Sequence, residues 1–456
     1  MRKGISANIR FRIIFCLCLT LVLLLGGTVA AGAEPDTEQP QAFGFWGSFV
    51  TYPDPGKVAS AAVFETSSGQ LIYSLDAGEI RYPASTVKIM SGALACELLE
   101  YRLEETVTVT QAMIQGVQGN SLKLKAGESL TVRDLLYGLI VGGYNDCAQA
   151  LAIVSCGSLT AFIERMNEKA LSIGARDTVF TNPSGMHDPE MVTTTADVLL
   201  WARYGLSLEL YRTIMNTESY MIPATEMSPS REFYNRNELV TDHRTRAYYD
   251  ARCIGMNAGY TDEGGWCAVT WTHREEGSFL VAVMGGEELS SGTVSSYTTV
   301  KTLLDWAYQK FGWTTVLKPG DTVVRVPLSG YSIVSDVPAT VMSEVRIFAP
   351  VSIGYRDLPG SEVRLASPSL EPPFGAGKEI GYVRLKYNGE TLATEKLMTA
   401  EAAELTSLSK WLHIAKSVES HPVVLVSAVS FLVMGIALTV FLRVRFRRRM
   451  RMSRYL

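Results

Sequence analysis

The stretch that decides the fold is Arg81-Tyr82-Pro83-Ala84-Ser85-Thr86-Val87-Lys88-Ile89-Met90. Ser85 and Lys88 stand three residues apart, at the start of an apolar segment whose spacing predicts a helix over 85–99. Side chains at this spacing lie on one face of a helix, one turn apart. An amine placed there can take a proton from a serine hydroxyl without any histidine. The pattern therefore makes Ser85 a candidate nucleophile and Lys88 its candidate base.

The Ser-x-x-Lys spacing alone is a weak signal, because about one or two chance matches are expected in a chain of ordinary composition. Ser407-Leu408-Ser409-Lys410 is a second match, which we interpret as accidental. Ser85 differs because it opens a long apolar helix, whose dipole favours an alkoxide and a neutral amine at that end. A serine that only caps the helix is the alternative interpretation.

The order of the predicted elements favours an α+β fold, with helices packed against an antiparallel sheet. Two strands over 59–65 and 70–74 are joined by Ser67-Ser68-Gly69, which is typical of a hairpin. A block of helices follows. The later predicted elements are helices over 131–141, 147–154 and 197–204, strands over 268–271 and 279–284, and a last helix over 298–311.

Several segments resemble the D-alanyl-D-alanine carboxypeptidases of serine peptidase family S11, the low-molecular-weight penicillin-binding proteins. The segment around Ser85 is similar to the nucleophile segment of that family. The other similar segments are 127–139, Asn145-Asp146-Cys147-Ala148, 182–186, 194–197, 259–267, 349–351 and 378–383. The resemblance covers roughly residues 55–400.

The resemblance implies a penicillin-binding or β-lactamase-like catalytic domain, followed by a small all-β domain. It implies that Ser85 attacks the terminal D-Ala-D-Ala bond of a peptidoglycan stem peptide, with Lys88 as general base. The acyl-enzyme would then be hydrolysed, and backbone amides including that of Ser85 would form the oxyanion hole. β-Lactam antibiotics are the expected acylating ligands, and no cofactor is implied.

The other two motifs depart from the family pattern. Asn145 of the second motif is present, but Gly143 stands where the family has a serine that relays protons. The third motif, Lys-Thr-Gly in the family, reads Asn257-Ala258-Gly259, and these are the candidate substrate-binding residues. Losing the lysine removes a charge-assisted contact with the substrate carboxylate. The loss of a nearby cation is also expected to raise the pKa of Lys88.

Two neighbouring residues receive structural interpretations only. Tyr144, beside Gly143, is expected to point away from the site, and His187 is interpreted as a loop residue at the rim of the cleft. Three functions stay open. They are a serine D,D-carboxypeptidase, a catalytically impaired pseudoenzyme that binds peptidoglycan or a protein partner, and a related hydrolase whose substrate lacks a free carboxylate.

Both ends of the chain carry targeting signals. Basic residues in 1–12, an apolar run over 13–27 and small residues after it predict a secretory signal peptide over 1–33, with an uncleaved anchor as the alternative. The uncharged segment 422–442 is long enough, at ~1.5 Å per residue, to cross a bilayer as a helix. The arginine-rich tail 443–456 follows, which predicts a single-pass cell-membrane protein with a cytoplasmic tail and an extracytoplasmic body.

The remaining boundaries follow from changes in composition. We expect a linker over 34–56, the hydrolase domain over 57–314, a β-sandwich over 315–400 and a juxtamembrane helix over 401–421, either on the membrane surface or as a spacer. The β-sandwich strands are predicted over 322–326, 340–348, 363–365, 381–387 and 391–397.

Charge and cysteine content exclude several classes of function. The net charge is −4 although both ends are basic, so the part between them is acidic and offers no broad basic face for nucleic acid. The five histidines show no metal-binding spacing, so we expect no structural metal. The cysteines after the signal are odd in number and predict no disulfide framework; they are Cys96, Cys147, Cys156, Cys253 and Cys267.

Overall fold

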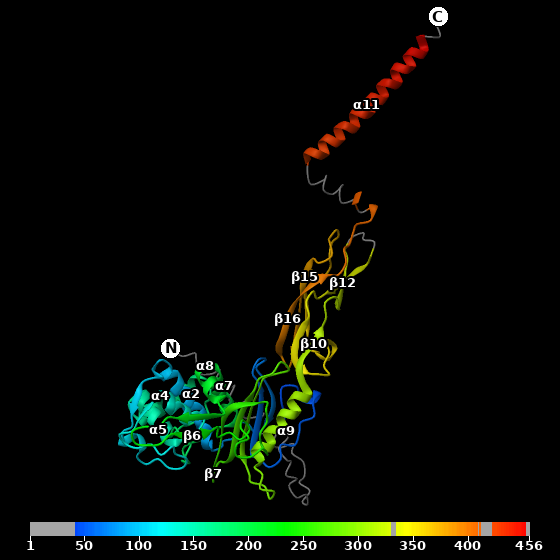
Figure 1. The fold of residues 1–456 in the computed structure, drawn as a ribbon. Helices are drawn as coiled ribbons and strands as arrows, with labels where there is room; N and C mark the ends of the chain where they lie inside the picture. The colour runs from blue at the N-terminus through cyan, green and yellow to red at the C-terminus, as the bar shows by residue number, and fades with distance from the viewer. Residues whose placement is uncertain (1–41, 330–333, 409, 412–421, 453–456) are drawn as a thin grey trace, which may run out of the picture. The chain divides into compact units, whose positions relative to one another are not determined.

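The computed structural model describes residues 42–329, 334–408, 410–411 and 422–452, and these have the predicted α+β fold (Figure 1). The predicted signal peptide and most of the predicted juxtamembrane helix lie outside the described residues.

The central element is a five-stranded antiparallel sheet. Its order is β2 (Gln70–Leu75), β1 (Ser60–Glu65), β9 (Phe279–Gly286), β8 (Gly265–Thr272) and β7 (Cys253–Thr261). The predicted hairpin between β1 and β2 is confirmed, and the strands predicted over 268–271 and 279–284 are found within β8 and β9, which pair with each other. β7 lies at the edge of the sheet, so its outer side has no neighbouring strand in the sheet. The segment around Ser85 packs against β7.

Local sequence signals explain where the main helices begin. A 3-10 turn, η2 (Ala84–Thr86), carries Ser85 into the helix. Thr131 caps α4, since its side chain accepts the N–H of Asp134 while the Asp134 carboxylate accepts the N–H of Thr131. The helices are α2 (Val87–Leu99), α3 (Gln111–Ile114), α4 (Val132–Ile140), α5 (Asn145–Cys156), α6 (Leu159–Ser172), α7 (Thr195–Ser207), α8 (Glu209–Met215) and α9 (Ser295–Lys310), with 3-10 turns η1 (Gly47–Phe49), η3 (Glu100–Arg102) and η4 (Tyr355–Asp357).

The central sheet separates two apolar cores, because alternate residues of a strand point to opposite faces. Ala62 and Phe64 of β1 belong to the core that includes residues of α2 and α7. Ala61 and Val63 belong to the core that includes residues of α9. Burial on both faces explains why these strands are apolar at almost every position.

Two short pairs of strands lie on the helical side of the central sheet. β3 (Thr106–Thr108) pairs with β4 (Ser129–Thr131), and β5 (Ser219–Ile222) pairs with β6 (Arg231–Tyr234). The second of these pairs leads directly into a segment that borders the candidate site, described below.

A module of β-strands follows α9. β10 (Phe311–Leu317) pairs with β13 (Val345–Pro350), and a five-stranded sheet has the order β11 (Thr322–Pro327), β12 (Asp336–Thr340), β16 (Glu390–Thr399), β15 (Glu379–Tyr387), β14 (Glu362–Leu365). The prediction of one strand over 340–348 is wrong. A bend at Met342 and Ser343 separates two strands that pair in different sheets.

The prediction of a linker over 34–56 is wrong for its described part, from Ala42 onward. Phe43 pairs with Ser74 of β2, and Trp46 is fully buried and donates a hydrogen bond to Gln70 Oε1 at 2.8 Å. Aromatic residues outweigh the glycine and proline content here, because burying one large ring stabilises more than the turn residues cost.

The C-terminal region differs from prediction at the start of the predicted juxtamembrane helix. Ala403 forms a bridge with Phe374, so the predicted helix over 401–421 does not start at its expected end. The helix α11 (Pro422–Met452) contains the predicted span, and Val429–Arg447 is long and apolar enough to cross a membrane by length and composition. It continues through the arginine run, since arginine and methionine favour helix.

Candidate active site

Ser85 and Lys88 meet at the start of α2. Lys88 Nζ lies 3.2 Å from Ser85 Oγ and donates to the backbone carbonyl of Ser184 at 2.5 Å. Lys88 is 2% exposed, whereas Ser85 remains half-buried and open to the cleft. The carbonyl of Ser184 occupies one N–H of the amine, so a neutral Lys88 can direct its lone pair at the serine hydroxyl.

The electrostatic surroundings of Lys88 differ from expectation. Burial and the nearby guanidinium of Arg236 lower the pKa of Lys88 to about 7. The pKa is therefore lowered from its ordinary value and not raised, mainly because the amine is buried and in addition because Arg236 places a cation nearby. A base with a pKa near neutrality is well matched to proton transfer at neutral pH.

The backbone around Ser85 is held in an uncommon conformation. Ala84 has φ +46°, a left-handed value that is rare for a residue with a side chain. Gly185 has φ +77°, and a Cβ there would lie 1.9 Å from the Ala84 carbonyl oxygen. Only glycine permits this approach, and it brings the carbonyl of Ser184 to Lys88.

Gly143 and Asn145 lie at the turn before α5. Gly143 has φ +65°, and a Cβ there would lie 3.3 Å from Arg236 Cγ, so a serine would be both strained and crowded. Asn145 Nδ2 donates to the Gln118 carbonyl at 2.7 Å, and its buried Oδ1 has no partner among the described residues. Tyr144 packs edge-on against Phe233, which confirms that it points away from the site.

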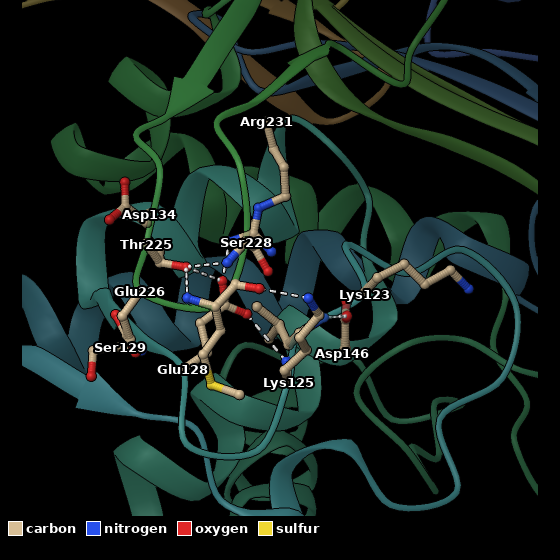
Figure 2. Close-up of polar contacts among 12 residues, drawn as sticks. Lys123, Lys125, Glu128, Ser129, Asp134, Asp146, Thr225, Glu226, Ser228 and Arg231 are labelled. Carbon is tan, nitrogen blue, oxygen red and sulfur yellow. Dashed lines mark hydrogen bonds and ion pairs between the residues drawn. The ribbon is translucent and has the colours of Figure 1, made fainter.

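Asp146 anchors the loop over residues 120–124, which lies against the turn at Gly143 (Figure 2). Its carboxylate accepts hydrogen bonds from the Ser121 hydroxyl at 2.7 Å and from the N–H groups of Leu122 and Leu124 at 3.0 and 3.1 Å. Asn120, on the same loop, donates to the carbonyls of Gly142 and Gly143. The loop and the second motif therefore form one hydrogen-bonded unit.

A buried ion pair joins this unit to the segment after β5. Glu128 is fully buried and accepts from Arg231 Nη2 at 2.7 Å, from the Thr225 hydroxyl at 2.8 Å and from the N–H of Lys125 at 3.1 Å. Figure 2 shows Arg231, Thr225, Lys125 and Glu128 gathered in one cluster of polar contacts. Since Arg231 begins β6, the ion pair fixes the start of the strand that leads to Arg236.

The third motif follows an irregularity in β7. Gly255 and Met256 have φ +50° and +64°, and the pairing with β8 shifts register before Asn257. Such a bulge re-aims the residues that follow it. Asn257 is 2% exposed, and its buried Oδ1 has no partner within the part of the chain described. A Cβ at Gly259 would lie 2.4 Å from Ser85 Cβ, so only glycine leaves space for the serine.

One cavity of about 440 Å³ collects the candidate residues. Ala258 borders it, although its methyl group belongs to the core under α9. His187 lies at the rim, as predicted, with Nδ1 3.5 Å from the Glu263 carboxylate. The candidate residues that line the cavity are Ser85, Gly143, Asn145, Asn257, Ala258 and Gly259.

Sequence reasoning missed Asn120, Ser184 and Arg236. Asn120 and Arg236 line the cavity, and the Ser184 carbonyl binds Lys88. No pattern in a single sequence distinguishes Arg236 from a surface arginine. Among the described residues, no group of His, Cys, Asp and Glu side chains is suited to a metal ion, and the five cysteines there are unpaired.

Comparison with known proteins identifies relatives of this site. A family model described as D-alanyl-D-alanine carboxypeptidase, peptidase S11, matches residues 51–288. The D-alanyl-D-alanine carboxypeptidase DacF of Bacillus subtilis is 26% identical over 378 residues, which span 82% of this chain and 93% of that protein.

Solved structures agree on the fold. Penicillin-binding protein 5 from Haemophilus influenzae superposes with a TM-score of 0.56 at 22% identity, over 78% of this chain and 99% of that one. A D-alanyl-D-alanine carboxypeptidase from Mycobacterium tuberculosis gives 0.51 at 28% identity, over 57% and 93%. The family model covers about half of the chain, including all three motif positions. The chain therefore belongs to the D-alanyl-D-alanine carboxypeptidase family, peptidase family S11.

Proposed function

We propose that this protein is an active serine-type D-Ala-D-Ala carboxypeptidase that acts on peptidoglycan stem peptides through an acyl-enzyme on Ser85. The observation that carries the proposal is the buried amine of Lys88, 3.2 Å from Ser85 Oγ, with its pKa lowered to about 7 by burial and Arg236. The altered second and third motifs do not remove this pair.

The mechanism has two halves. Neutral Lys88 takes the hydroxyl proton as Ser85 Oγ attacks the carbonyl carbon of the penultimate D-alanine. The tetrahedral intermediate collapses, Lys88 gives its proton to the amine of the leaving D-alanine, and an ester on Ser85 remains. Water then attacks the ester, Lys88 takes a proton from that water and the proton returns to Ser85. Backbone N–H groups, including that of Ser85, would stabilise the oxyanion.

A second candidate is a protein of the same fold that binds stem peptides, or a partner, with slow turnover. Gly143 favours it, because no serine hydroxyl is available there to relay a proton. The buried acceptor Asn257 Oδ1, which has no partner among described residues, favours a third candidate, a hydrolase whose substrate offers an N–H group instead of a carboxylate.

We further propose that α11 anchors the protein in the cell membrane with the catalytic part outside. The arginines that follow the apolar stretch support this orientation by the positive-inside rule. The N-terminal segment would act as the export signal.

The proposal is tested with the full-length chain in detergent. We expect a fluorescent penicillin to label the protein covalently, with the adduct on the peptide that contains Ser85. We also expect release of D-alanine from a diacetyl-L-Lys-D-Ala-D-Ala peptide. Absence of both label and D-alanine at high probe and substrate concentrations would contradict the proposal. Labelling without D-alanine release would favour the second candidate.

Replacing Gly259 by alanine is expected to slow acylation by penicillin about 100-fold or more, because the added methyl group would displace Ser85. Stopped-flow labelling measures this rate. Gly78→Ala is the matched control, since Gly78 is exposed and nothing lies within 4 Å of its added methyl group. A Gly259→Ala protein that is acylated at the original rate would show that β7 does not confine the serine.

A further inference from the structure

We propose that Asn257 binds and orients the water that hydrolyses the acyl-enzyme, through its side-chain oxygen Oδ1. The inference rests on the proposed function, because it assigns a role within the second half of the same reaction. Asn257 stands where the family has the lysine of its third motif. The role therefore arises from a position at which this chain departs from the family pattern.

Asn257 lies on the side of β7 that faces the nucleophile. Residues two apart in a strand point to the same face and are about 6.6 Å apart. A Cβ at Gly259 would lie 2.4 Å from Ser85 Cβ, so the face shared by Gly259 and Asn257 is turned toward the serine. Val269, the cross-strand partner of Asn257, belongs to the core that includes residues of α2. The Asn257 side chain is therefore within reach of Ser85 through one water.

The carboxamide of Asn257 is buried but unpaired. It is 2% exposed, and neither its oxygen nor its nitrogen makes a hydrogen bond with another described residue. Asn237 is fully buried too, yet its Nδ2 donates to the carbonyls of Gly255 and Val269 at 2.8 and 3.1 Å. Its Oδ1 accepts the N–H of Leu239 at 3.2 Å. A buried polar group without a partner destabilises the fold, so the Asn257 amide is suited to a molecule that enters the cavity.

The backbone before Asn257 is held in a strained conformation that aims this side chain. Gly255 and Met256 both have left-handed φ values, +50° and +64°. Met256 carries a side chain, so its conformation costs free energy that neighbouring contacts must offset. Asn237 supplies such contacts, since it bonds the carbonyls of Gly255 and Val269 on the two paired strands. Strain retained beside an unpaired polar group is typical of functional sites.

Hydrolysis of the ester needs a water that donates to two acceptors. One acceptor is Lys88. Once Ser85 is acylated, the lone pair of the neutral amine no longer faces a serine hydroxyl and can receive a water proton. A second acceptor must hold the other O–H, so that a lone pair of the water points at the ester carbonyl. Asn257 Oδ1 meets this need, because no N–H or O–H of the described residues donates to it.

The second acceptor has no equivalent in the altered second motif. Gly143 has no side chain, and the guanidinium of Arg236 carries donors only. Asn145 Oδ1 also has no partner among the described residues, but its amide is anchored by the Gln118 carbonyl and not on β7. It is available to an N–H group of the stem peptide.

The hydrolytic step moves one proton through Lys88. The water oxygen forms a bond to the ester carbonyl carbon while Lys88 takes one water proton, and the other O–H stays hydrogen-bonded to Asn257 Oδ1. The tetrahedral intermediate collapses with cleavage of the bond between that carbon and Ser85 Oγ. Lys88 then returns its proton to Oγ. Asn257 gains and loses no proton, so a neutral carboxamide can fill this role.

The test measures acylation and deacylation separately in the full-length chain in detergent. A fluorescent penicillin labels the protein, and loss of the label after an excess of unlabelled penicillin gives the deacylation rate. We expect Asn257→Leu, which has a similar volume and no acceptor, to slow deacylation about 10- to 100-fold and to change the acylation rate less than about threefold. Asn257→Asp keeps an acceptor oxygen and should deacylate faster than Asn257→Leu at pH 9.

A matched control and a stability measurement exclude a purely structural effect. Ser296→Ala is the control, because Ser296 is fully buried, its hydroxyl has no partner within the described ranges, and it does not line the cavity. Its deacylation rate should equal that of the wild-type chain. Asn257→Leu should keep or raise Tm, since leucine removes an unpaired buried amide. A lower Tm with slower acylation would show a structural role and overturn the inference.

The remaining outcomes separate this inference from the proposed function. Equal deacylation rates of the wild-type and Asn257→Leu chains would overturn the inference and leave the proposed function standing. Slower acylation with unchanged deacylation would also overturn it, and would assign the amide to an N–H group of the substrate. Equal deacylation of Asn257→Asp and Asn257→Leu would count against an acceptor role in the same way. Absence of labelling in the wild-type chain would overturn the proposed activity and this role with it.

Discussion

Replacement of Ser85 by alanine is expected to abolish covalent labelling by penicillin and to lower D-alanine release by at least about 10⁴-fold. The reason is that Oγ is the atom that would form the ester, and among the described residues no other hydroxyl is hydrogen-bonded to Lys88. The substitution removes one atom from a half-buried side chain, so the fold should be unaffected. Gel fluorescence and a D-alanine assay measure the two effects.

The second Ser-x-x-Lys match supplies the matched control. Ser407 is exposed, and the amine of Lys410 lies 3.2 Å from the Glu404 carboxylate. Ser407→Ala should therefore label and turn over substrate like the wild-type chain. Persistent labelling of the Ser85→Ala protein would show that another residue is the nucleophile.

Replacement of Lys88 by methionine is expected to slow acylation of Ser85 by about 10⁴-fold, because the serine loses its base. In the wild-type chain the acylation rate should rise as pH increases through about 7, where Lys88 loses its proton. The rate of the Lys88→Met protein should lack this dependence. Stopped-flow labelling between pH 5 and pH 9 would show both effects.

The Lys88→Met substitution, which is expected to lower activity, should not lower the stability of the fold. Burial lowers the pKa of Lys88 from 10.5 to about 7, so the unfolded chain binds more protons between these values. The free energy of unfolding linked to Lys88 therefore increases as pH rises from about 7 toward 10.5. At lower pH the buried amine must be protonated, which destabilises the folded state. Methionine should keep or raise Tm at neutral pH. A lower Tm together with lost activity would instead indicate misfolding.

Much of the fold could be predicted because its signals are local. The hairpin between β1 and β2, the helix predicted over 131–141 and the helix after Ser85 each depend on residues within one or two turns. The errors arose where packing decides. Trp46 draws an apparent linker into the core, and the bend at Met342 splits one apolar run between two sheets.

In the candidate site, too, some features follow from the sequence and others follow only from the folded structure. The sequence by itself determined the family, the spacing of Ser85 and Lys88 and the loss of side chains at Gly143 and in the third motif. Only the tertiary structure decided the protonation of Lys88, because its pKa depends on burial and on Arg236, which lies far along the chain. A carbonyl at Ser184 and a cation at Arg236 have no sequence signature, since their roles come from where the folded backbone places them.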